Sequence, residues 1–223
     1  MKSAGKRIQR QRKEGTIMSE ISVKWEFERD RCVLIVIDMQ NDFVLDGAIR
    51  QVPEAKNQLP KICRLTDKCR QFGIPVIYTI QEVDAVFNPL EIIGRPVLKD
   101  EGMRKDTKGI QIVDDLTPKP DDVIIRKRRF SAFYQTDLEI ILRNIRGSEK
   151  PVDTTIICGT VTNICCESTA RDAFFRDYKV VFGTDICSAR TMESHNATLV
   201  NMETFGRNMD CESIIAALEA GRG

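Results

Sequence analysis

The chain has 223 residues, of which 42% are hydrophobic and 30% are charged, a length and composition that suit one folded α/β domain and exclude a disordered chain. The formal net charge of +1 argues against a dedicated nucleic-acid binder. No apolar run reaches the roughly 18 residues that a membrane-spanning helix needs, so we expect no membrane partner.

The N-terminus differs in charge from the rest of the chain. Residues 1–13 hold six Lys and Arg residues and no acidic residue. Removing these six from the 34 basic residues leaves 28 against 33 acidic ones, so residues 14–223 carry a net charge of −5. We therefore predict a basic flexible arm over residues 1–20 and a single folded domain over residues 21–223.

Apolar runs alternate with segments of helical period along this domain. Strands are expected at Cys32–Asp38, Pro75–Gln81, Asp122–Lys127, Asp153–Gly159 and Lys179–Asp185, with a sixth near Met209–Cys211. Helices are expected at Glu54–Phe72, Gln135–Arg146, Asn163–Asp177, Thr191–Thr204 and Glu212–Ala220. This alternation predicts an α/β three-layer sandwich, in which helices cover both faces of a mostly parallel six-stranded sheet.

One segment interrupts the alternation. Residues Glu82–Leu116 contain several prolines and glycines and show little periodicity. A long irregular connection after a strand is either a functional loop or a solvated excursion without a role, and both readings stay open here.

The cysteines and the lone histidine limit the possible chemistry. The eight cysteines include no C-x-x-C pair, and no apolar segment of a secretory signal follows the basic N-terminus. We expect free thiols, a cytoplasmic location, and no metal or other cofactor. His195 lies in a predicted helix, where a structural hydrogen bond is the favoured role.

Three reactive residues lie at or just beyond predicted strand ends. Asp38 and Lys127 each end a strand, while Cys165 follows a third strand in the first turn of a predicted helix. The helix N-terminus should lower the pKa of this thiol. Nucleophile, base and cation would then share one edge of the sheet, although a buried structural thiol is an equally good reading from spacing alone.

Three motifs resemble those of the isochorismatase-like cysteine hydrolases. They are DMQNDF at Asp38–Phe43, K-x-x-x-S-A-F at Lys127–Phe133, and G-x-x-T-x-x-C-x-x-x-T-A at Gly159–Ala170. The resemblance extends in order and spacing from about Arg31 to Leu218. It implies the same parallel-sheet fold and an assembly as a homodimer or homotetramer.

The resemblance also assigns roles to residues. It implies an Asp-Lys-Cys triad of Asp38, Lys127 and Cys165, with Cys166 in a position usually held by valine. It further implies a cis peptide at Thr160–Val161. The backbone N–H groups of Val161 and Cys165 would then form an oxyanion hole.

Within the family, the sequence is most similar to ureidoacrylate and related carbamoyl- or ureido-group amidohydrolases. The segment TIQEVDAVFNP lacks the histidine of the nicotinamidase branch, and Cys165 is absent from true isochorismatases. The implied substrate is a small linear amide, and Phe43, Glu82 and Phe130 are candidate substrate contacts. The alternatives are isochorismatase-type hydrolysis of another small molecule, or a non-catalytic oligomeric or thiol-sensing member of the fold.

Overall fold

The computed structural model describes residues 22–147 and 149–223, so the predicted arm over residues 1–20 lies outside the described residues. The strands are β1 (Cys32–Ile37), β2 (Val76–Gln81), β3 (Val123–Lys127), β4 (Thr154–Thr160), β5 (Lys179–Ser188) and β6 (Arg207–Met209). The helices are α2 (Asn41–Val44), α3 (Ala55–Gln71), α4 (Pro89–Gly94), α5 (Leu138–Asn144), α6 (Glu167–Phe174), α7 (Met192–Met202) and α8 (Cys211–Ala220).

The six strands form one parallel sheet in the order β3-β2-β1-β4-β5-β6. The chain starts in the middle of this sheet and builds outward first to β3 and then to β6. β1 and β4 are neighbours, so the chain reverses its direction of growth between them. In open α/β sheets, such a switch point opens a crevice at the carboxyl ends of the strands.

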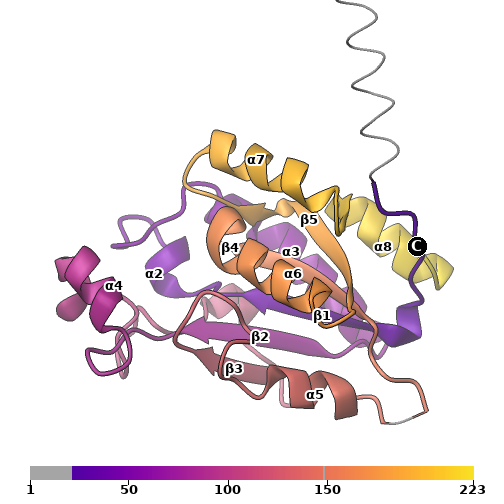
Figure 1. The fold of residues 1–223 in the computed structure, drawn as a ribbon, viewed down its shortest axis with the longest axis horizontal. Coiled ribbons are helices and arrows are strands. Elements are labelled where there is room, and N and C mark those ends of the chain that lie inside the picture. Colours follow the sequence, from indigo (N-terminus) through magenta and orange to yellow (C-terminus); the bar gives the residue numbers. More distant parts are fainter. Residues whose placement is uncertain (1–21, 148) are drawn as a thin grey trace, which may run out of the picture.

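Side-chain alternation divides the hydrophobic core into two layers. On β1, Cys32, Leu34 and Val36 pack with α3 and α8, whereas Val33, Ile35 and Ile37 pack with α5, α6 and α7. Figure 1 shows α3 and α8 behind the sheet and α6 in front of it. Both faces are covered, which explains why the central strands are apolar throughout rather than at every second residue.

The predicted three-layer architecture is confirmed, and the differences lie at element ends. β6 begins at Arg207, two residues before the sixth strand expected from sequence. The helix expected from Asn163 instead starts as a π-helical turn, Thr162–Cys166, which continues as α6. The Cys166 N–H donates to the Val161 carbonyl across this turn, which widens the start of the helix.

The irregular segment 82–116 holds α4 and two short 3₁₀ turns, Pro96–Lys99 and Asp114–Leu116. It projects from the carboxyl end of β2 (Figure 1), and the Val83 N–H is bonded to the Met103 carbonyl. Among the described helices, none is long and apolar enough to cross a lipid bilayer.

Candidate active site

Asp38 follows β1 directly and is fully buried. Its backbone has φ of +46°, a left-handed conformation that aspartate tolerates better than most residues. The Thr79 hydroxyl donates to Asp38 Oδ1 at 2.5 Å, and Lys127 Nζ lies 2.7 Å from Asp38 Oδ2. Both carboxylate oxygens therefore have a partner, which makes burial of the negative charge tolerable.

Lys127 is the last residue of the edge strand β3 and is also fully buried. Besides the Asp38 carboxylate, its ammonium contacts Gln81 Oε1 at 2.6 Å and the Arg129 carbonyl at 3.2 Å. Burial alone would lower the pKa of Lys127, but attraction to Asp38 and to Cys165 raises it above its usual value. The raised pKa favours the charged ammonium at the centre of the site.

Cys165 reaches the same place from β4. Gly159 has φ of +117°, and a Cβ built on it would lie 2.1 Å from the Ile37 carbonyl oxygen, so only glycine allows β4 to lie this close to β1. The peptide bond between Thr160 and Val161 is cis, as expected. The π-helical turn then brings the Cys165 thiol to Asp38 and Lys127, with which it interacts.

The protonation of Cys165 differs from the sequence expectation. Burial raises the pKa of the thiol well above its usual value; Lys127 opposes this shift, whereas the charge of Asp38 and a hydrogen bond to its carboxylate add to it. The expected lowering of this pKa by a helix N-terminus is therefore wrong for the free protein, because the effect of burial exceeds that of Lys127. The raised pKa favours the protonated thiol, which is hydrogen-bonded to the Asp38 carboxylate.

Three residues that hold Asp38 and Lys127 were missed by sequence reasoning. Thr79 accepts a hydrogen bond from the Asp38 N–H and donates to its carboxylate, while the Thr160 hydroxyl donates to the Asp38 carbonyl. Gln81 accepts from Lys127, and its buried Nε2 has no protein partner. Thr79 and Gln81 occupy alternate positions at the end of one predicted strand, which places both side chains on one face of the sheet. This pattern could have identified them from the sequence.

His195 has the structural role favoured from sequence. Its Nε2 donates to the Thr184 carbonyl at 2.9 Å, so Nδ1 is the acceptor for the Thr162 hydroxyl, also at 2.9 Å. Burial lowers the pKa of His195, with the Thr184 bond opposing it. A neutral imidazole therefore anchors the first residue of the turn that carries Cys165.

Phe43 and Phe130, two of the three expected substrate contacts, lie in surroundings that differ from each other. Phe43 is buried in the core on the α3 side of the sheet, where it packs rather than faces a cavity. Phe130 is partly exposed and lines a cavity of about 310 Å³ together with Asn88, Leu90, Glu91, Arg95 and Arg129. The Lys127 ammonium donates to the carbonyl of Arg129, so this cavity lies directly beside the buried site.

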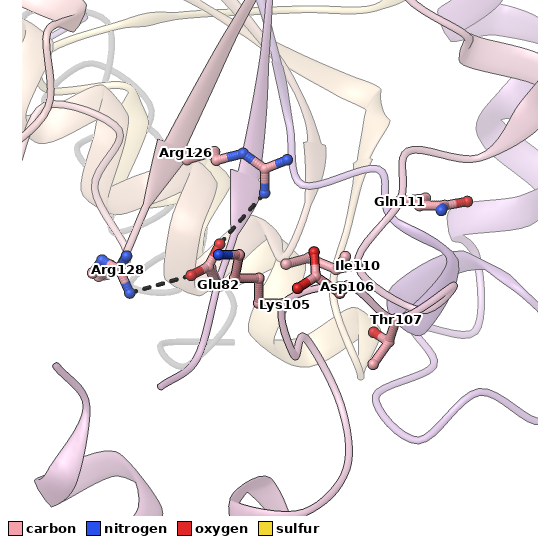
Figure 2. Close-up of a pocket in the computed structure, with 8 residues that line it drawn as sticks. All are labelled: Glu82, Lys105, Asp106, Thr107, Ile110, Gln111, Arg126 and Arg128. Atoms are coloured by element: carbon pink, nitrogen blue, oxygen red, sulfur yellow. Dashed lines mark hydrogen bonds and ion pairs between the residues drawn. The ribbon is translucent and has the colours of Figure 1, made fainter. Parts of the chain in front are cut away.

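The third expected contact, Glu82, points away from Asp38, Lys127 and Cys165. It follows Gln81 on β2, so by alternation its side chain lies on the opposite face of the sheet. Figure 2 shows Glu82 between Arg126 and Arg128, with ion-pair distances of 3.4 and 3.3 Å. These residues line a separate cavity of about 650 Å³ with Lys105 and Asp106, so the geometry does not favour Glu82 as a contact of a substrate at Cys165.

All eight cysteines are free thiols. Over residues 22–147 and 149–223, no three His, Cys, Asp or Glu side chains gather in a way that could hold a metal ion.

Comparison with known proteins places this geometry in context. Residues 32–213 match the model of the isochorismatase domain. A "probable inactive nicotinamidase" of Arabidopsis thaliana is 36% identical over 178 residues, which is 78% of this chain and 88% of the relative. A "ureidoacrylate amidohydrolase" of Methylobacterium radiotolerans is 33% identical over 211 residues, covering 85% and 79%. The crystal structure of a cysteine hydrolase from Pseudomonas syringae pv. phaseolicola superposes with a TM-score of 0.83 at 28% identity, covering 90% and 98%.

Proposed function

Because the chain belongs to the isochorismatase family of hydrolases, we propose that it is a metal-independent cysteine amidohydrolase that cleaves the C–N bond of a small linear amide. The observation that carries this proposal is the fully buried ion pair of Asp38 and Lys127 in contact with Cys165. A buried charge pair is costly, and here it adjoins the Cys165 thiol, which is hydrogen-bonded to the Asp38 carboxylate. Ordinary structural packing does not require such an arrangement.

In the first half of the reaction, Asp38 accepts the Cys165 proton as the sulfur attacks the amide carbonyl. The raised pKa of the thiol suits this order of events, because the proton leaves only when the carbon–sulfur bond forms. Lys127 stabilises the growing negative charge of the sulfur. The N–H groups of Val161 and Cys165 would hold the tetrahedral oxyanion, each donor being worth roughly 3 kcal/mol in comparable sites.

In the second half, Asp38 returns the proton to the leaving nitrogen, and the C–N bond breaks to leave a thioester on Cys165. Water then attacks the thioester with Asp38 again as base, which releases the acid and restores the thiol. Throughout, Thr79 and Lys127 keep the two Asp38 oxygens in place. Every proton in this cycle passes through one carboxylate.

We assign the substrate to the ureido or carbamoyl class. The 33% identity with a protein named ureidoacrylate amidohydrolase, over 85% of this chain, supports this assignment. The absence of histidine from residues 79–89 argues against the nicotinamidase branch.

A second candidate function is a non-catalytic, thiol-sensing member of the fold. The observation in its favour is the 36% identity with a relative named probable inactive nicotinamidase. It predicts a reactive Cys165 without turnover of any amide. Asp38, Lys127 and Cys165 are all buried in one site, and this favours the enzyme over the thiol sensor.

The test is ammonia release from ureidoacrylate, N-carbamoyl amino acids, biuret and nicotinamide. Cys165→Ala should reduce turnover by at least about 10³-fold, because loss of a covalent nucleophile removes the entire pathway. Cys166→Val is the matched control: this neighbouring thiol is equally buried, but its side chain is hydrogen-bonded with Cys187 rather than with Asp38, so most activity should remain. Equal loss in both variants would contradict the assignment of the nucleophile, and no turnover by the wild type would favour the thiol sensor.

A further inference from the structure

Three arginines come together at the rim of the site. Arg50 precedes α3, Arg95 follows α4, and Arg190 lies two residues beyond Ser188, the partner of Thr160 in the sheet register. Arg190 Nη2 reaches the Arg50 carbonyl at 3.5 Å, so the two segments are in contact. All three residues therefore lie on the carboxyl side of the sheet, where Cys165 also lies.

Arg50 is the least satisfied member of this cluster. Its Nε is buried and has no hydrogen-bond partner. Burial lowers the pKa of Arg50, repulsion from Arg190 and Arg95 lowers it further, and attraction to Glu91 and to Cys165 opposes these effects. A guanidinium held beside two others, with one donor unpaired, is an arrangement that an anion would stabilise.

Glu91, an acidic residue whose charge acts on Arg50, already has two other partners. Glu91 pairs with Arg95 at 3.6 Å through Oε1 and accepts a hydrogen bond from Asn88 through Oε2. Glu91 is thus shared between Arg95 and Arg50, and with Arg190 beside Arg50 the cluster keeps an excess of positive charge. Glu91 and Arg95 also line the 310 Å³ cavity that adjoins the Lys127 site, so this charge borders open space large enough for a small ligand.

We propose that Arg50, with Arg95 and Arg190 beside it, binds a carboxylate of the substrate and thereby orients the scissile amide at Cys165. The inference rests on the proposed amidohydrolase function and narrows its substrate to acidic linear amides, such as N-carbamoyl amino acids, over neutral ones of the same size. Arginine suits this role because its planar donor groups match the two oxygens of a carboxylate.

The experiment compares each acid with its own methyl ester, which removes the charge and keeps the reacting group. N-carbamoylglycine and 3-ureidoacrylate are assayed with wild type, Arg50→Gln and Arg50→Lys by ammonia release. We expect the ratio of kcat/KM for acid over ester to fall at least tenfold in Arg50→Gln and to recover in part in Arg50→Lys. Arg143→Gln removes an exposed arginine of α5 paired with Glu139, and it should leave the ratio unchanged.

A second measurement does not depend on turnover. N-carbamoylglycine is titrated calorimetrically into Cys165→Ala and into Cys165→Ala with Arg50→Gln, and the second change should raise Kd at least tenfold. An unchanged Kd, an unchanged acid-to-ester ratio, or a preference of the wild type for the esters would overturn the carboxylate site. If wild type hydrolyses none of the compounds, the amidohydrolase proposal fails, while the titration still decides whether Arg50 binds a carboxylate.

Discussion

The ends of β2 and β3 carry two charge clusters that lie on opposite faces of the same two strands. Gln81 and Lys127 face the α5, α6 and α7 side, where the Lys127–Asp38 pair is completely shielded from solvent. The residues next to them, Glu82 with Arg126 and Arg128, face the other way, and the Arg126 side chain is 61% exposed. Neighbouring residues of one strand thus differ in how strongly water screens their charges.

The difference shows why a charged sequence motif alone does not locate a reactive site. Both clusters contain a carboxylate and at least one cation, at 2.7 Å in the inner cluster and at 3.3 and 3.4 Å in the outer one. Water screens the arginines of the outer cluster, so their pairing contributes little, whereas removing one partner of the inner pair leaves an uncompensated charge in the protein interior. The inner cluster also contacts the thiol of Cys165.

The largest expected effect comes from breaking the inner pair. Lys127→Met should lower the free energy of unfolding by about 3–5 kcal/mol, because the Asp38 carboxylate loses its cation in a buried site. Urea denaturation followed by circular dichroism measures this change. Arg126→Gln removes an exposed arginine of the same strand and leaves Glu82 paired with Arg128, so it should lower this free energy by less than about 1 kcal/mol. Similar losses in the two variants would show that the two faces do not differ as described.

A smaller effect is expected from the outer carboxylate. Glu82→Gln should cost about 1 kcal/mol of stability, since its two partners are the partly exposed Arg126 and Arg128. The KM for an amide substrate should change less than about twofold, because the side chain lies on the other face from Cys165. A large rise in KM with unchanged stability would instead establish Glu82 as the substrate contact expected from the sequence.

The smallest expected effect concerns the pH dependence of stability. Burial raises the pKa values of Cys158 and Cys165, so the folded protein keeps thiol protons that the unfolded chain releases above about pH 8.5. Because the folded state then binds more protons, stability is complete below that pH and falls as the pH rises further. Urea denaturation at pH 7.5, 8.5 and 9.5 measures this decline.

Cys158→Val is the control for that series, since it replaces a buried thiol on β4 with an apolar side chain of similar size. Its stability should decline less steeply with pH, by up to about 1.4 kcal/mol per pH unit. Identical slopes in wild type and variant would contradict the role of the buried thiol.

The sequence predicted the sheet well because its strands are continuous apolar runs with both faces covered. It was less accurate where tertiary contacts determine the backbone: β6 is short and lies at the sheet edge, and the start of α6 is widened by the Cys166 bond to Val161. Local periodicity contains no information on either contact.

For the site, the sequence identified the three residues that the fold brings together, but not their surroundings. The pKa direction of Cys165 was wrong because the extent of burial is a property of packing rather than of position in a helix. The role of Gln81 depends on the register of β2 with β3, which pairs it with Lys127, and the role of Thr79 depends on the register of β2 with β1. The opposite orientation of Glu82 follows from the alternation of side chains along β2.

Gly159 has a consequence for redesign of this protein. The residue lies against Ile37, which precedes Asp38, and it begins the segment that ends at Cys165. The contact between these two main chains therefore sets the distance between the Asp38 carboxylate and the Cys165 sulfur. A side chain at position 159 would meet the Ile37 carbonyl, so any redesign of the site has to keep glycine there.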